Sequence, residues 1–487
     1  MPPQRRHMLV SNRLPIVVSQ DALTATWQIT PAVGGLVTAL APILRDHGGV
    51  WIGWTGLVDG EDAAVMPLLA QESQALGYTL QPVPLTQDER DTFYFGFANE
   101  IIWPLFHEVP TRGSFEPRYW DGYRTVNRSF AQTIAAQDHE DAAIWVHDYH
   151  LMHVAADLRV LGVSAPIRFF LHIPFPAPSI FAILPWRDAV IDALLAYDDL
   201  GFQTPRDVAH FLACVRLRYP YCAIAAEATQ TMLRIDDRLI RVGAYPISVD
   251  AADFLARSQT SEVTERVAAI RESFPGQHLL LGIDRLDYTK GIPQRLRALN
   301  YALEHYPALR GAITLIQIVV PSRTAIPEYA DLKMEIDQLV GQINSQWARL
   351  GWVPIHYLYR MQDETRLLAY YRAADVALVT PLKDGMNLVA KEYCICTHAD
   401  GVLVLSEFAG AASQLGADAL LVNPYDIAGC AAAIHRAVTM PTRERQARMR
   451  RLKQQIHGQD IFAWLAACLA RTAPDESGGE GADDERA

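Results

Sequence analysis

Two cations follow a buried apolar run in the second half of the chain, which reads LLLGIDRLDYTKGIPQRL. Arg285 and Lys290 lie just beyond the run, with Asp287 between them. An arginine fork and a lysine ammonium at a strand end are suited to a diphosphate. The competing interpretation is a surface ion pair with Asp284 or Asp287. The fragment alone leaves both interpretations open.

A second anion-compatible loop lies in TPLKDGMNLVAKEY, residues 380–393. Asp384 begins a turn there, and the helix that follows carries Glu392, whose carboxylate can accept both hydroxyls of a ribose. Backbone amides at the start of that helix can meet a phosphate or sugar hydroxyls. These amides belong to Gly385, Met386, Asn387, Leu388 and Val389. The alternative is helix capping by Asp384 with Glu392 in solvent.

Polar side chains also follow two apolar strands in the first half, WVHDYHLMH and FFLHIPFP. Asp148 is the carboxylate nearest the first strand end. His147, His150 and His153 surround it and raise the alternative of a metal site, although no HExxH pattern is present. His172 ends the second strand, where a buried imidazole needs a partner, either a ligand hydroxyl or a core group.

Glycines, arginines and aromatic side chains complete the candidate set. Gly34 and Gly35 precede a helix, where a glycine pair either lets backbone amides approach a phosphate or a sugar, or forms a plain turn. Arg13 and Arg323 each follow a strand and suit the phosphate of a sugar phosphate. Aromatic faces with polar tips suit a sugar, unless they are ordinary core residues. The aromatic candidates are Trp54, Tyr94 and Trp103.

Short apolar runs alternate with helical patterns, as in parallel sheets covered by helices on both faces. HMLVSNRLPIVV, for example, is predicted as one strand. The series breaks near residues 246–250, so the sequence predicts an α/β protein with two Rossmann-like, doubly wound domains facing a cleft. The predicted divisions are an N-terminal domain at 1–247, a C-terminal domain at 248–455, a helix at 456–470 that packs back on the N-terminal domain, and a disordered acidic tail at 471–487.

The composition of the 487 residues restricts the class of partner. The formal net charge of −12 argues against nucleic acid but leaves small anions possible. The six cysteines form no CxxC pair, which favours buried free thiols over a zinc site or disulfides. No signal peptide and no apolar run of roughly 18 residues is apparent, so we expect no membrane contact and a cytoplasmic location. A homo-oligomer is expected for a soluble enzyme of this size.

Taken together, these stretches resemble the retaining glycosyltransferases of family 20. The matching motifs are SNRLP, GGL, GWTG, WDGY, WVHDYHL, FFLHIPFP, GFQT, RLDYTKG, PSR, TPLKDGMNLVAKEY and LVLSEFAGAA. The resemblance implies a GT-B fold and transfer of glucose from a nucleoside diphosphate glucose, usually UDP-glucose, to glucose 6-phosphate. The implied products are α,α-trehalose 6-phosphate and UDP, and no metal or other cofactor is implied.

The resemblance also implies a role for each candidate residue. The residues implied in donor binding are Gly34, Gly35, His172, Arg285, Lys290, Asp384, Gly385, Met386, Asn387, Leu388, Val389 and Glu392. Those implied in acceptor binding are Arg13, Trp54, Tyr94, Trp103, Asp148 and Arg323. Those implied in catalysis are Asp148, His172, Arg285, Lys290 and Asp384. In this scheme Arg285 and Lys290 neutralise the departing diphosphate.

Several alternatives stay open at the level of sequence. A relative that uses glycerol 3-phosphate would share the donor site, although it would leave the aromatic walls unfilled. A catalytically silent sugar-phosphate sensor need not keep the complete donor site. Transfer can occur on one face with help from the leaving phosphate, or by double displacement through Asp148 or Asp384. Ser248, in AYPISVD, stands where the family commonly has glycine, so a hinge or cleft contact can differ.

Overall fold

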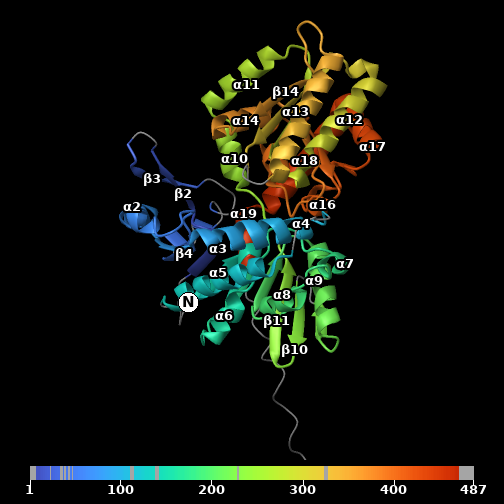
Figure 1. The fold of residues 1–487 in the computed structure, drawn as a ribbon. Helices are drawn as coiled ribbons and strands as arrows, with labels where there is room; N and C mark the ends of the chain where they lie inside the picture. The colour runs from blue at the N-terminus through green and yellow to red at the C-terminus, as the bar shows by residue number, and fades with distance from the viewer. Residues whose placement is uncertain are drawn as a thin grey trace, which may run out of the picture.

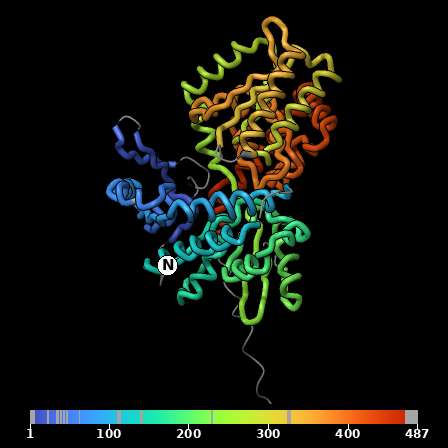
Figure 2. The backbone as a smooth tube through the Cα atoms, viewed as in Figure 1, coloured from blue at the N-terminus to red at the C-terminus, as the bar shows by residue number. Residues whose placement is uncertain are grey.

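In the computed structural model the chain folds into two bodies, each built on a mainly parallel sheet (Figure 1). The first half, coloured blue to green, and the second, yellow-green to red, meet at a shared junction (Figure 2). The structure describes residues 7–21, 24–32, 37, 40–41, 44–45, 48–109, 115–137, 142–226, 230–322 and 327–470. The predicted residues that lie outside this description are Gly34, Gly35, Arg323 and the tail at 471–487.

The first sheet has nine strands in the order β5-β4-β1-β6-β7-β8-β11-β10-β9. They are β1 (His7–Arg13), β4 (Gly49–Trp54), β5 (Thr79–Pro82), β6 (Ala143–His147), β7 (Ile167–Phe170), β8 (Asp199–Phe202), β9 (Ala223–Ala226), β10 (Thr231–Ile235) and β11 (Arg238–Ala244). Neighbours are parallel except at the antiparallel β11-β10-β9 edge. The prediction of one strand in HMLVSNRLPIVV is wrong, because the run divides at Leu14 and Pro15. Its second part is β2 (Ile16–Gln20), which forms a hairpin with β3 (Trp27–Pro31).

The helices of the first half connect these strands. They are α2 (Asp62–Leu76), α3 (Gln87–Glu89), η1 (Arg90–Ile102), α4 (Trp103–Phe106), α5 (Pro117–Ala135), η2 (Tyr149–Leu151), α6 (Val154–Val160), α7 (Pro178–Phe181), α8 (Arg187–Leu194) and α9 (Pro205–Arg218). Local chemistry explains the start of α9, since Thr204 and Asp207 form a capping box around Pro205. By contrast η1 is a π-helix, a rare form that recurs at functional sites.

The second sheet is parallel throughout, in the order β14-β13-β12-β15-β16-β17. Its strands are β12 (His278–Arg285), β13 (Ile313–Val320), β14 (Ile355–Tyr359), β15 (Val376–Val379), β16 (Val402–Ser406) and β17 (Leu420–Val422). The helices around it are α10 (Ala251–Ser258), α11 (Ser261–Ser273), η3 (Tyr288–Lys290), α12 (Ile292–His305), η4 (Pro307–Leu309), α13 (Pro327–Trp347), α14 (Glu364–Ala373), α15 (Leu388–Cys396), α16 (Ala412–Leu415), α17 (Ile427–Thr439) and α18 (Thr442–Gly458). Within the described ranges, no helix is long and apolar enough to span a membrane.

The chain passes between the two bodies twice. The first crossing runs from the end of β11 to α10, and the second runs from α18 to the last helix, α19 (Ile461–Leu469). The crossings lie side by side, because the backbone N–H of Ile461 donates to the carbonyl oxygen of Val249 at 3.0 Å. In Figure 1, α19 lies at the junction of the two bodies.

The helix α19 packs on the first sheet. Trp464 is only 4% exposed and stacks on Trp145 with ring centroids 5.6 Å apart. It also meets Phe170 edge-on at 5.3 Å, and its Nε1–H donates to the carbonyl oxygen of Tyr245 at 3.1 Å. These residues belong to a hydrophobic cluster that includes buried side chains of both sheets. The junction is therefore partly a shared core.

Replacing Trp464 by alanine should lower the free energy of unfolding by about 3–5 kcal/mol, because a buried ring packed on two others is lost. The matched control is Phe462→Ala on the same helix, since Phe462 is 47% exposed; it should cost under about 1 kcal/mol. Urea unfolding followed by circular dichroism measures both. Equally small effects would contradict a structural role for α19.

Candidate functional site

Loops that follow strands of both sheets meet at the junction. Asp148 follows β6 and His172 lies beyond β7, whereas Asp384 lies in the loop after β15. A Cβ atom added to Gly385 would lie 2.1 Å from the carbonyl oxygen of His172. The two backbones can therefore touch only because Gly385 has no side chain.

An ion pair joins the loops after β12 and β15. Lys290 Nζ lies 2.6 Å from Asp384 Oδ2, and the side chains are only 12% and 13% exposed. Burial alone would raise the pKa of Asp384, but the Lys290 ammonium more than offsets this, so the pKa is lowered. Asn387 Nδ2 donates to the same carboxylate oxygen at 3.0 Å. Asp384 is therefore an ionised group that holds a cation and the start of α15 in place.

The N-terminus of α15 has no side-chain cap, although Asn387 stands at the capping position. The predicted alternative of capping by Asp384 is therefore wrong. Asn387 has φ 78° and ψ 80°, a left-handed conformation that asparagine tolerates better than most residues. An uncapped helix N-terminus beside Lys290 is suited to an anion.

Glu392 lies on α15 and is held by a hydrogen bond. Tyr371 donates its hydroxyl to Glu392 Oε2 at 2.7 Å. Burial raises the pKa of Glu392, and the bond from Tyr371 opposes that rise. The predicted alternative of a freely solvated Glu392 is wrong, and the fixed carboxyl is suited to bind a pair of hydroxyls.

Arg285 reaches the other body from the end of β12. Its guanidinium carbon lies 5.8 Å from the ring centroid of Trp103, and its side chain is 47% exposed. The contact with Asp287 is long, at 3.9 Å, and Asp287 Oδ1 accepts a bond from the backbone of Thr289. Asp284 pairs instead with Arg295. The surface ion-pair interpretation of Arg285 is therefore weak, and its exposed guanidinium faces the junction.

Asp148 has a strained backbone at the end of β6. Its φ of 76° and ψ of 165° lie in a region that is almost restricted to glycine. Its Oδ1 accepts the backbone N–H of His172 at 3.2 Å, and its own N–H donates to Phe170 at 2.8 Å. Such strain persists where the surroundings enforce one side-chain position, as at functional sites.

The WDGY motif on α5 supports the loop that follows Asp148. The Tyr123 hydroxyl donates to the carbonyl oxygen of Tyr149 at 2.9 Å and accepts from the N–H of Met152 at 3.0 Å. Asn127 Nδ2 donates to the carbonyl oxygen of His150 at 3.0 Å. Buried side-chain bonds of this kind hold an irregular loop in one conformation.

Three of the predicted acceptor residues lie together. The guanidinium carbon of Arg13, at the end of β1, lies 4.0 Å from the ring centroid of Trp54 and 6.0 Å from that of Tyr94. The Trp54 and Tyr94 rings meet edge-on at 5.8 Å. Trp103, which is also in the first body, lies instead against Arg285 of the second body.

The histidines near Asp148 have partners within the protein. His147 Nδ1 and His172 Nε2 share a hydrogen bond at 3.2 Å. Desolvation lowers the pKa of His172 to about 3, and it also lowers the pKa of His147 well below its ordinary value. His153 pairs with Asp157 at 3.1 Å. No group of three or more His, Cys, Asp or Glu side chains in the described ranges could hold a metal ion, so the alternative of a histidine metal site lacks support.

Sequence reasoning missed His107, which lies just after α4. Its ring packs on Trp103 at 4.2 Å, and its Nδ1 bonds to the Trp103 carbonyl oxygen at 2.7 Å. Burial lowers its pKa to about 4, although the carboxylates of Asp287 and Asp384 raise it. In the described part of the chain its buried Nε2 has no hydrogen-bond partner. The available signal was the WPLFH stretch, in which the histidine follows Trp103 by one helical turn.

Comparisons with known proteins agree with this geometry. The chain matches the model of glycosyltransferase family 20 over residues 5–473. It is 39% identical to the trehalose-6-phosphate synthase of Mycolicibacterium smegmatis, covering 98% of this chain and 94% of that protein. A trehalose-phosphate synthase (UDP-forming) from Burkholderia xenovorans, solved with glucose-6-phosphate, is 34% identical, with a TM-score of 0.83 and coverage of 95% and 98%. A solved structure from E. coli, described as trehalose-6-phosphate bound with UDP-2-fluoro glucose, is 35% identical, with a TM-score of 0.84 and coverage of 95% and 97%.

The fold is thus that of the GT-B glycosyltransferases, with two facing parallel-sheet bodies and a site between them. The chain belongs to glycosyltransferase family 20. The predicted fold class and the resemblance stated from the motifs are both confirmed.

The strain at Asp148 can be measured with two substitutions that both remove the carboxylate. Asp148→Gly should be more stable than Asp148→Ala by about 1 kcal/mol, because glycine adopts a positive φ without steric cost. Each loses the bond to His172, so that loss cancels in the comparison. Urea unfolding of the pair provides the test, and an alanine variant at least as stable as the glycine variant would exclude strain.

The buried neutral histidines should make stability depend on pH. The pKa of His107 is about 4 in the fold and about 6.5 in an unfolded chain, so the unfolded state takes up the proton first. Stability is therefore fully present above about pH 6.5 and is lost as the pH falls toward about 4. His107→Gln should remove about 2–3 kcal/mol of the loss between about pH 7 and pH 4.5.

The control for this titration is His305→Gln, which replaces an exposed histidine on α12. The free energy of unfolding is measured at each pH for the three proteins. Equal pH slopes in the unsubstituted protein and His107→Gln would contradict a neutral buried His107.

Proposed function

We propose that the protein transfers glucose from UDP-glucose to glucose 6-phosphate with retention, giving α,α-trehalose 6-phosphate and UDP. One observation carries the proposal: the Arg285 guanidinium lies over Trp103 of the opposite body, in the same cleft as the Lys290–Asp384 pair. Cations for a donor diphosphate and aromatic rings for an acceptor sugar then share one junction. Similarity over nearly the full chain to the relatives described above supports this reaction.

The donor diphosphate is proposed to bind at Arg285, Lys290 and the first-turn amides of α15. Arg285 has an exposed fork, which suits two phosphate oxygens. Lys290 is held by Asp384 and supplies a fixed point charge. Bond cleavage builds negative charge on the leaving phosphate, and fixed cations aimed at that charge contribute a few kcal/mol each. We place the ribose at Glu392, whose Oε2 already accepts from Tyr371.

The transferred glucose is proposed to lie between His172 and Asp384. His172 is neutral, so it can exchange hydrogen bonds with a hydroxyl without adding positive charge beside a developing oxocarbenium ion. Asp384 is ionised and can accept a hydroxyl while its Oδ2 holds Lys290. Asp148 would face both sugars from the end of β6.

The acceptor is proposed to bind against the first body. Arg13 lies over Trp54 and near Tyr94, which suits a phosphate beside a sugar ring. Arg323, from the other body, completes the phosphate contact in this proposal. A hexose phosphate fills such aromatic walls better than a three-carbon phosphate does.

Same-face transfer is the mechanism that we favour over double displacement. A carboxylate nucleophile needs a charge that is not already held by a cation or a hydrogen-bond donor. Asp384 is held by Lys290 and Asn387, and Asp148 accepts the N–H of His172. Both carboxylates are therefore better suited to positioning, and the leaving phosphate can take the proton of the acceptor hydroxyl.

Several features of the cellular context are also proposed. We propose that transfer needs no metal, because Arg285 and Lys290 supply the charge that a divalent cation would otherwise supply. All six cysteines are free thiols, which supports a reducing compartment such as the cytoplasm. A homo-oligomer is proposed from chain size alone, and light scattering tests it.

The substrate pair can be tested by nucleoside diphosphate release from UDP-glucose in the presence of EDTA. We expect release with glucose 6-phosphate and little with glycerol 3-phosphate, since only the hexose fills the Trp54 and Tyr94 walls. Release with glycerol 3-phosphate alone would keep the donor site and overturn the acceptor. Release with neither acceptor would favour another donor or the sensor alternative. Activity that is present without EDTA and lost in EDTA would overturn the metal-free proposal.

Arg285→Ala should lower kcat by about 10²-fold or more, because a cation aimed at the leaving phosphate is lost. Its melting temperature should be unchanged, since the side chain is half exposed and only loosely paired. Arg297→Ala is the matched control, because Arg297 is an exposed arginine that pairs with Glu335 on the outer helices. Turnover of Arg285→Ala equal to that of the control would remove the diphosphate role.

A further inference from the structure

A cavity of about 810 Å³ lies within the second body, and none of the candidate site residues lines it. Its walls come from α10, α11, α14, α18 and the segment that follows α15. This volume falls within the roughly 300–1,000 Å³ that is usual for small-molecule sites. The cavity is therefore large enough for a ligand of metabolite size.

The walls of the cavity carry basic side chains and no acidic ones. The basic residues are Arg271, Arg372, His398, Arg450 and Lys453. No aspartate or glutamate is among the described residues that line it. This is notable in a chain whose formal net charge is −12.

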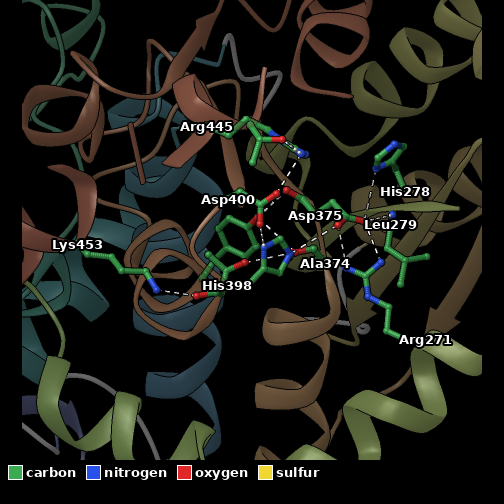
Figure 3. A network of polar contacts seen from close by, with 12 residues as sticks. Arg271, His278, Leu279, Ala374, Asp375, His398, Asp400, Arg445 and Lys453 are labelled. Atoms are coloured by element: carbon green, nitrogen blue, oxygen red, sulfur yellow. Dashed lines mark hydrogen bonds and ion pairs between the residues drawn. The ribbon is translucent and has the colours of Figure 1, made fainter. Parts of the chain in front are cut away.

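Two of these basic groups contact carboxylates behind the wall. Arg271 makes a bidentate pair with Asp375 at 2.8 and 3.0 Å, and His398 Nδ1 lies 2.8 Å from Asp400. Figure 3 shows these contacts, with Lys453 approaching the same segment from α18. The remaining three cations, those of Arg372, Arg450 and Lys453, form no ion pair with any described carboxylate.

Two of the three unpaired cations cap helix ends. Lys453 Nζ donates to the carbonyl oxygen of Thr397 after α15 at 2.6 Å, and Arg372 donates to that of Ser258 at the end of α10 at 2.7 Å. Each helix end carries about half a negative charge, so the two ends offset about one of three positive charges. Burial lowers the pKa of Lys453, as expected where no anion compensates it. About two positive charges are left without a partner.

We propose that this cavity is a second anion site that binds a small phosphorylated molecule. Arginine and lysine side chains from α14 and α18 would contact the phosphate. Leu255, Val267 and Met449 would contact the less polar part of the ligand. A phosphate dianion matches the excess charge better than a single carboxylate does.

The position of the cavity connects it to the junction. The helices α10 and α18 line it, and each leads into one of the two crossings between the bodies. The helix α15 ends at the cavity and begins at the donor loop. A ligand that bridges α10 and α18 therefore contacts the helices that hold both linkers.

Hydrogen exchange with mass spectrometry tests the site with inorganic phosphate as the probe. Phosphate should slow exchange in peptides from 251–258 and 442–458, and separately in the cleft at 384–392. In Arg450→Glu, the phosphate concentration that gives half of the maximal protection in 251–258 and 442–458 should rise by about tenfold or more. The response of the cleft segment should stay unchanged. Lys453→Met should act in the same direction, and the exposed Arg450 makes its variant the one least prone to misfold.

Arg443→Ala is the matched control, because Arg443 is an exposed arginine on α18 that does not line the cavity. It should leave all three responses unchanged. The proposal would be overturned if phosphate failed to protect 251–258 and 442–458. It would also be overturned if this protection persisted unchanged in Arg450→Glu. A parallel arm with glucose 6-phosphate distinguishes a sugar ester, which would protect at lower concentration, from free phosphate. Because binding is read without turnover, failure here leaves the proposed glucosyl transfer intact.

Discussion

Lys290 and Asp384 lie in a part of the cleft from which most water is excluded, where an unpaired charge of either sign would be costly. Their contact therefore requires the loops after β12 and β15 to stay together, and the backbone bond from Leu382 to Thr289, at 2.7 Å, reinforces this. The same carboxylate fixes Asn387, and with it the start of α15. The position of Glu392, further along that helix, follows from the pair.

Buried histidines of the first body lie close to this charged edge. Burial keeps His107, His147 and His172 unprotonated, so no further positive charge is placed beside Lys290. A cation at the leaving phosphate is useful only if the sugar side of the cleft is not also cationic, because the sugar itself gains positive character. The close approach of Gly385 to His172 sets the distance between these two environments.

Sequence reasoning predicted those features that are determined locally. The run ITLIQIVV is apolar except at Thr314 and Gln317 because β13 is buried on both faces, and Pro205 with the Thr204 cap marks the start of α9. The family resemblance implied six acceptor residues, and the structure brings three of them together, Arg13, Trp54 and Tyr94. The roles assigned to these residues stay predictions.

Features that depend on tertiary packing were not predictable. The π-helix that carries Tyr94 has no sequence pattern that distinguishes it from an α-helix, because its i→i+5 bonds depend on what the helix packs against. No local signal predicts the burial of His107 or of Lys391, because burial is set by distant segments. Lys391 donates to Ile247 at 2.7 Å and to Gln414 at 2.6 Å, and burial lowers its pKa to about 7.

The linker that accepts the Lys391 hydrogen bond also contains a destabilising group, the side chain of Ser248. Ser248 is fully buried, and its hydroxyl has no hydrogen-bond partner among the described residues. A buried hydroxyl without a partner costs about 1–3 kcal/mol, a cost that a glycine at this position would not carry. Ser248 therefore destabilises the linker, while the Lys391 bond and the packing of Trp464 stabilise the arrangement that brings Arg285 to Trp103.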